Sequence, residues 1–153
     1  MGVSPEELNT SFLVTMADIS LPIDGALSML NSAKKHSKIG IITNGFVDIQ
    51  KLRLANAGLK NFFDLLVISE EVGFAKPDKR IFEHALEKMN NPSPESVLMV
   101  GDNAHSDIIG AHNFGFDTCW YNPKGLPLPE NIVCTHQVAS QAQLQLLFES
   151  ISI

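Results

Sequence analysis

Hydrophobic residues follow two alternating patterns along this chain. Segments with apolar residues three or four positions apart predict helices over about residues 5–17, 24–33, 47–57, 77–89, 104–114 and 141–148. Between them lie short apolar runs rich in β-branched residues, which predict buried strands over 39–43, 65–69, 96–100, 118–121 and 132–138. Strands that alternate with helices predict an α/β fold, a parallel sheet covered by helices on both faces.

The ends of the first two helices carry recognisable signals. The sequence Ser-Pro-Glu-Glu at 4–7 is a capping box with proline at the first helical position. Asp24 is expected to cap the second helix. The apolar face of the first helix is predicted to consist of Leu8, Phe12, Leu13 and Met16.

Composition and charge narrow the class of protein. The 153 residues are enough for one domain with a hydrophobic core, and a net charge of -6 argues against nucleic-acid or anionic-membrane partners. No apolar run approaches the roughly 20 residues of a membrane span, and no leader pattern opens the chain. The two cysteines lack metal-site spacing, so we expect reduced thiols and a cytoplasmic location. The sequence does not predict an oligomeric state.

Polar residues follow the first predicted strand at Thr43-Asn44-Gly45. A hydroxyl, an amide and backbone N–H groups at a strand-to-helix turn can bind an anion. A helix cap followed by a turn glycine explains the same residues and is the better interpretation of this segment alone.

Lys76 stands just before Pro77, in a loop that leads into the fourth predicted helix. Its ammonium group can bind a phosphate as a point charge. Taken alone this signal is weak, because most loop lysines are solvated.

The third signal is Gly101-Asp102, with Asp107 in the first turn of the next helix. Asp102 offers the oxygen ligand that Mg²⁺ prefers, and an aspartate that ends a buried strand needs a partner. Asp107 could hold a water, the lysine or the metal's shell, or simply suit the helix N-terminus. Together the three signals favour electrostatic binding of a phosphoryl group.

The segments Ile-Ile-Thr-Asn-Gly, Ala-Lys-Pro and Val-Gly-Asp-Asn-x-x-Ser-Asp resemble the second, third and fourth motifs of the haloacid dehalogenase superfamily. Within it the chain is most similar to the bacterial pyrimidine 5'-nucleotidase group. The resemblance implies a Rossmann-like core and a Mg²⁺-dependent phosphomonoester hydrolase acting on a small phosphorylated metabolite, a nucleotide. It implies that Thr43, Asn44 and Lys76 bind the phosphoryl group, that Asp102 binds Mg²⁺, and that Lys76 and Asp107 are catalytic.

The family's first motif, Asp-x-Asp-x-Thr, has no counterpart here. The acidic residues before Thr43 are Glu6, Glu7, Asp18 and Asp24, none in a predicted strand. By the resemblance, residues 1–20 are the end of a helical cap, and residues 21–153 are an α/β core that lacks its first, central strand and its nucleophile. We therefore expect an incomplete chain that does not turn over substrate alone.

Two other functions stay open. The chain could be a non-catalytic phosphate-binding or regulatory module that kept three motifs. It could also catalyse another reaction on the same scaffold, as a sugar-phosphate phosphatase or mutase or as a dehalogenase. The mutase shares the motifs seen here, whereas a dehalogenase would not need Asp102 for a metal.

Overall fold

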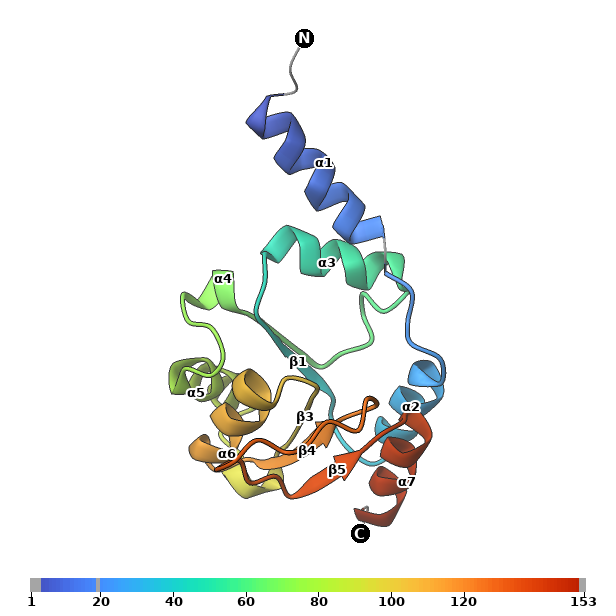
Figure 1. Ribbon diagram of the computed structural model, residues 1–153, viewed down its shortest axis with the longest axis vertical. Coiled ribbons are helices and arrows are strands. Elements are labelled where there is room, and N and C mark those ends of the chain that lie inside the picture. The colour runs from blue at the N-terminus through green and yellow to red at the C-terminus, as the bar shows by residue number, and fades with distance from the viewer. Residues whose placement is uncertain (1–3, 19, 152–153) are drawn as a thin grey trace.

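The computed structural model describes residues 4–18 and 20–151 (Figure 1). Helices and strands alternate along most of the described chain, as the hydrophobic pattern predicts. The strands are β1 (Gly40–Thr43), β2 (Leu65–Ile68), β3 (Leu98–Gly101), β4 (Asp117–Tyr121) and β5 (His136–Val138). The α-helices are α1 (Pro5–Asp18), α2 (Ala26–Ala33), α3 (Val47–Asn56), α4 (Ser69–Val72), α5 (Lys79–Lys88), α6 (Gly110–Phe114) and α7 (Gln141–Ile151).

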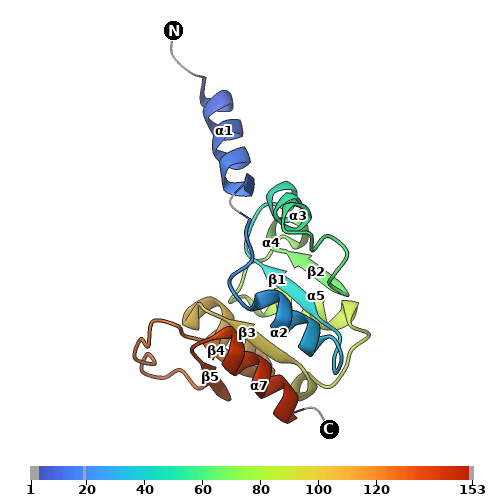
Figure 2. The ribbon, with the colours of Figure 1, turned by 90° about the vertical axis from the view of Figure 1, so that its right-hand side faces the viewer.

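The strands form two parallel sheets. In one, β1 pairs with β2 so that Thr43 lies opposite Ile68, and in the other β4 lies between β3 and β5, with Gly101 opposite Trp120. Figures 1 and 2 both place β1 next to β3. Within the described residues these two strands are not paired with each other, so each has one free edge.

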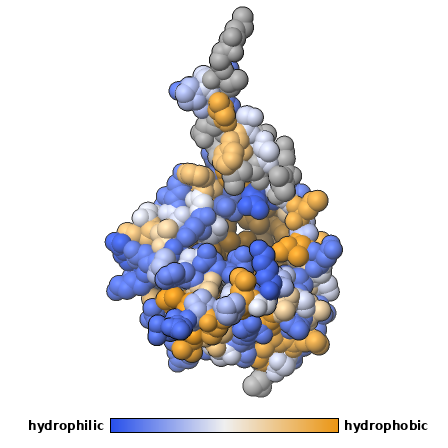
Figure 3. All heavy atoms as spheres, viewed as in Figure 1, coloured by the Kyte–Doolittle hydropathy of each residue, from blue (hydrophilic) through white to orange (hydrophobic). Residues whose placement is uncertain are grey.

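The first strand, β1, is less buried than its sequence predicts. Residues 39–43 were predicted to form a buried strand, but Ile41, Ile42 and Thr43 are only half-buried and Gly40 is exposed. The reason is that β1 has a strand neighbour on one side only. Figure 3 shows a recess in the middle of the molecule with hydrophobic atoms at its bottom.

Helices cover both faces of the strands, which confirms the predicted α/β class. On one face Val67 packs with Ile81, Phe82 and Ala85 of α5 and with Ala111 of α6. The opposite face carries the cluster Met29, Cys119, Val138 and Leu144, which joins α2 and α7 to β4 and β5. Along β3, Met99 packs toward the first cluster and Leu98 and Val100 toward the second, as alternation along a strand requires.

Several local predictions are corrected. Gly25 (φ 81°), not Asp24, precedes α2, and Asp78 rather than Pro77 opens α5, with its side chain accepting from Arg80 N. The one-turn helix α4 and the 3₁₀ turn η1 (Pro94–Ser96) were not predicted. The predicted helix over 104–114 exists, but its first part is the π-helical segment η2 (Ala104–Ile109).

Helix α1 extends away from the rest of the molecule and packs against α3 (Figures 1 and 2). Leu8 and Phe12, expected on a packed face, are each 60% exposed, whereas the side chains of Leu13 and Met16 lie outside the described residues. A domain division at residue 20 stays a prediction. Among the described helices, none is long and apolar enough to cross a membrane.

Candidate active site

Lys76 links the end of β1 to the helical segment η2 that follows β3. It lies in the loop between α4 and α5, and its Nζ donates to Ile42 O of β1 at 2.7 Å. The same Nζ forms an ion pair with Asp107 Oδ1 of η2 at 2.8 Å. The two side chains are only 10% and 7% exposed, so this charge pair is almost entirely removed from water.

Asp107 is satisfied on both carboxylate oxygens. Besides the ammonium group, Oδ1 accepts a hydrogen bond from Ser106 Oγ at 3.0 Å, and Oδ2 accepts one from Asn103 N at 3.1 Å. A buried carboxylate is stable only when it is paired and hydrogen-bonded in this way. The sequence left three partners open for Asp107, namely a water, the lysine and the metal's shell. Of these three, the structure shows contact with the lysine.

Gly101 leaves room for that carboxylate. A Cβ atom placed on Gly101 would lie 2.6 Å from Cγ of Asp107, closer than real side chains approach. The glycine that ends β3 is therefore required by packing against Asp107, at a position where the sequence pattern alone shows only a strand end.

Asn44 makes two hydrogen bonds to the backbone of Lys76. Its Oδ1 accepts from Lys76 N at 2.8 Å, and its Nδ2 donates to Lys76 O at 2.9 Å. Thr43 ends β1 immediately before it and is half-buried. Phosphoryl binding by Thr43 and Asn44 stays a prediction, and the contacts seen tie Asn44 to the lysine.

Asp102 differs from the expectation for an aspartate that ends a buried strand. Its side chain is exposed, so the burial cost falls on Asp107 instead. The Asp102 carbonyl accepts a hydrogen bond from Trp120 Nε1 at 3.0 Å, which fixes the backbone at this point.

The donor chemistry at Asp102 fits a magnesium site in part. Mg²⁺ takes one or two carboxylates and fills its remaining positions with water and phosphate oxygens. Asp102 supplies one exposed carboxylate, while both oxygens of Asp107 already accept hydrogen bonds. Within the described part of the chain, no group of three or more His, Cys, Asp or Glu residues is placed to hold a metal, so further ligands would have to come from water, phosphate or other protein.

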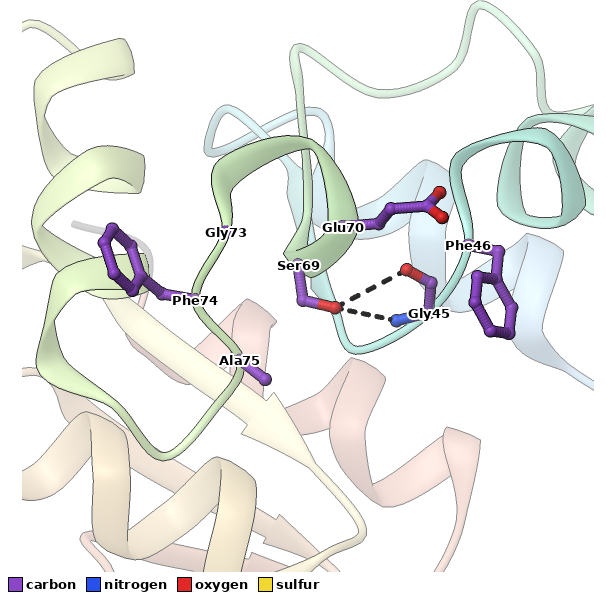
Figure 4. Close-up of a pocket in the computed structure, with 7 residues that line it drawn as sticks. All are labelled: Gly45, Phe46, Ser69, Glu70, Gly73, Phe74 and Ala75. Carbon is purple, nitrogen blue, oxygen red and sulfur yellow. Dashed lines mark hydrogen bonds between the residues drawn. The ribbon is translucent and has the colours of Figure 1, made fainter.

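A pocket of about 440 Å³ is lined in part by Gly45 and Ala75, the chain neighbours of Asn44 and Lys76. Figure 4 shows Phe46 and Phe74 on opposite sides of it, with Glu70 between them. Ser69 Oγ holds the neighbouring turn by accepting from Gly45 N at 3.0 Å. The lining is mostly apolar and 60% of Phe46 is exposed, so the pocket offers an aromatic surface.

Sequence reasoning missed two residues that organise this site. Trp120 ends a predicted strand, and nothing in a strand sequence shows that an indole N–H reaches a carbonyl 18 residues away. Ser106 stands directly before Asp107, and that position is a usable signal for a contact between them.

The family model and the most similar curated proteins that we compared agree on one family. The family model described as haloacid dehalogenase-like hydrolase matches residues 3–115. The chain is 51% identical over 147 residues to pyrimidine 5'-nucleotidase YjjG of Escherichia coli (strain K12), and 34% identical over 145 residues to pyrimidine 5'-nucleotidase PynA of Streptococcus pneumoniae. These alignments cover 96% and 91% of this chain but only 65% and 61% of those proteins.

A solved structure agrees with the sequence relatives. The crystal structure of the HAD-hydrolase YfnB from Bacillus subtilis, bound to magnesium, superposes with a TM-score of 0.88 at 30% identity. The superposition covers 96% of this chain and 65% of the YfnB chain. This chain therefore spans about two thirds of the length of the relatives it matches. The chain belongs to the haloacid dehalogenase-like hydrolases.

Proposed function

We propose that this chain is the phosphoryl-binding part of a Mg²⁺-dependent phosphatase that hydrolyses pyrimidine nucleoside 5'-monophosphates. The observation that carries the proposal is the Lys76 ammonium group, held between Ile42 O of β1 and Asp107 of the helical segment that follows β3. The substrate class rests on the likeness to two proteins named pyrimidine 5'-nucleotidase.

Lys76 would neutralise charge on the phosphoryl group. An ammonium group has three N–H donors, and two of them are directed to Ile42 O and Asp107. The third can donate to a phosphoryl oxygen, next to the hydroxyl of Thr43. Preorganised donors of this kind, away from water, stabilise the charge that spreads over the transferring group.

Asp102 would hold the magnesium ion, whose charge, when it is bound, stabilises the phosphate oxygens. Its exposed carboxylate supports this role. Asp107 would not be a ligand, because its carboxylate keeps Lys76 in place.

The nucleophile would come from outside the residues of this chain. Covalent phosphoryl transfer needs a nucleophile such as a carboxylate, and the buried Asp107 is committed to Lys76. The free edges of β1 and β3 support a place for one more parallel strand between them, since unpaired edges are templates for strand addition. A carboxylate at the end of that strand would face Lys76.

The apolar pocket beside Asn44 is the proposed place for the base of the nucleotide. Its size lies within the range of small-molecule sites, and the ring of Phe46 is exposed at its side. Phe46→Ala is therefore expected to raise KM more than it lowers kcat.

The test measures phosphate release from uridine and thymidine monophosphates. We expect release by a form extended at its amino end with the residues encoded upstream, and none by the 153-residue chain. Chelation of Mg²⁺ or Asp102→Ala should abolish release, and activity that survives both would contradict the metal assignment. If the extended form instead binds phosphate without turnover, the protein is a phosphate-binding module.

A further inference from the structure

The side chain of Asn44 makes the same pair of hydrogen bonds to Lys76 that a neighbouring strand would make. Oδ1 accepts from the backbone N of Lys76 at 2.8 Å, while Nδ2 donates to its carbonyl at 2.9 Å. Both polar atoms of one amide thus contact a single residue 32 positions later in the chain. A two-point contact fixes both the position and the orientation of that peptide segment.

The position of the Lys76 backbone also determines where its ammonium group can lie. A lysine side chain has four rotatable bonds and loses much rotamer freedom when it is ordered. Nζ can meet Ile42 O at 2.7 Å and Asp107 at 2.8 Å only if its own Cα is held at the right place. Asn44 follows β1 by one residue, so it ties the lysine to the strand whose carbonyl the ammonium contacts.

We propose that Asn44 is a positioning residue, which sets where the Lys76 ammonium group lies and does not itself bind the phosphoryl group. The proposal rests on the proposed function only in so far as Lys76 serves the phosphoryl group. The placement of the ammonium group is a property of the 153-residue chain and can be measured without catalysis.

The first readout is the side-chain NMR signal of Lys76 in the labelled chain, without phosphate. In Asn44→Ala we expect the Lys76 Nζ and Hε signals to move toward those of the exposed Lys51 and Lys60. In the matched variant Asn31→Ala, which removes an exposed amide that donates to Leu27 O at 2.8 Å, they should not move.

The second readout is a pH profile of Asn44→Asp. A protonated carboxyl group has one acceptor oxygen and one O–H donor, as the amide has, whereas the carboxylate only accepts. The Lys76 signals of this variant should therefore return toward the wild-type positions as pH falls through the pKa of the new carboxyl group. Asn31→Asp provides the control, because its titration should leave Lys76 unaffected.

The third readout is kinetic, in whichever form hydrolyses nucleotides. We expect Asn44→Ala to lower kcat/KM about 100-fold, the loss typical of a group displaced by about 1 Å, with no change in Asn31→Ala. Lys76 signals that stay in place in both Asn44 variants would overturn the proposal, whatever the activity. If no form hydrolyses nucleotides, the proposed function fails while the NMR test of Asn44 still stands.

Discussion

Two ion pairs involve residues at the start of α5 or just before it, yet they differ in separation along the chain, in exposure and in distance. Lys76 and Asp107 are 31 residues apart in sequence, and their side chains are 10% and 7% exposed. Asp78 and Arg80 are neighbours at the start of α5, 31% and 53% exposed, with a contact of 2.5 Å. The shorter distance belongs to the pair that matters less, because water screens it.

The difference teaches which charges organise the candidate site. A buried pair is costly to break, because removal of one partner leaves the other charged and unpaired. An exposed pair is worth little, and here it serves a local purpose as the N-cap of α5. Four predictions test this contrast.

The largest effect is expected for Lys76→Met. It leaves the Asp107 carboxylate buried without its counterion, so we expect a loss of about 3–5 kcal/mol in the free energy of unfolding, measured by urea titration. Lys76→Met/Asp107→Asn should recover part of this loss, because no unpaired charge remains. A loss below about 1 kcal/mol in the single variant would mean that water reaches this pair.

The next effect is expected for Gly101→Ala. The added methyl group overlaps the carboxyl group of Asp107, and such overpacking costs about 1–3 kcal/mol. If the clash acts through the Asp107 side chain, its cost should not add to that of Asp107→Gly, which also removes the Cβ atom that the new methyl group would overlap. Additive losses in urea titration would show that Gly101 matters for another reason.

A smaller effect is expected for Ser106→Ala. This variant removes one hydrogen bond to Asp107 Oδ1 and leaves the ion pair, so we expect a loss of about 1 kcal/mol. Ser96→Ala is the matched control, since Ser96 Oγ donates to Ser93 O at an exposed site. Equal losses in the two variants would argue against a special role for the hydroxyl beside Asp107.

The smallest effect is expected for Asp78→Asn, which keeps a capping oxygen for Arg80 N. The side-chain hydrogen bond from Arg80 lowers the pKa of Asp78 to about 2, so its contribution to stability is present above about pH 3.8 and is lost as pH falls toward 2. We expect a melting temperature close to that of the wild type at pH 7, and a weaker dependence on pH between 4 and 2. A large loss at pH 7 would contradict the contrast between the two pairs.

Some features of the candidate site could be predicted from the sequence, and others could not. Strand ends at Thr43 and Gly101 were visible because apolar runs stop there at polar residues. Lys76 was identified by a short motif, and Asp107 was named only as one possible partner, since a loop lysine can meet any carboxylate that the fold brings near it. The same limit applies to Asn44, whose amide is equally suited to a ligand or to a backbone.

The amino-acid sequence alone predicts the α/β class, the order of strands and helices, and the three polar segments with a phosphate-binding character. These follow from local periodicity and from the residues that end each run. The folded structure was needed to learn that Asp107 is the buried carboxylate and Asp102 the exposed one, and that Asn44 holds Lys76. Burial and pairing depend on which distant segments meet, and local sequence patterns do not contain that information.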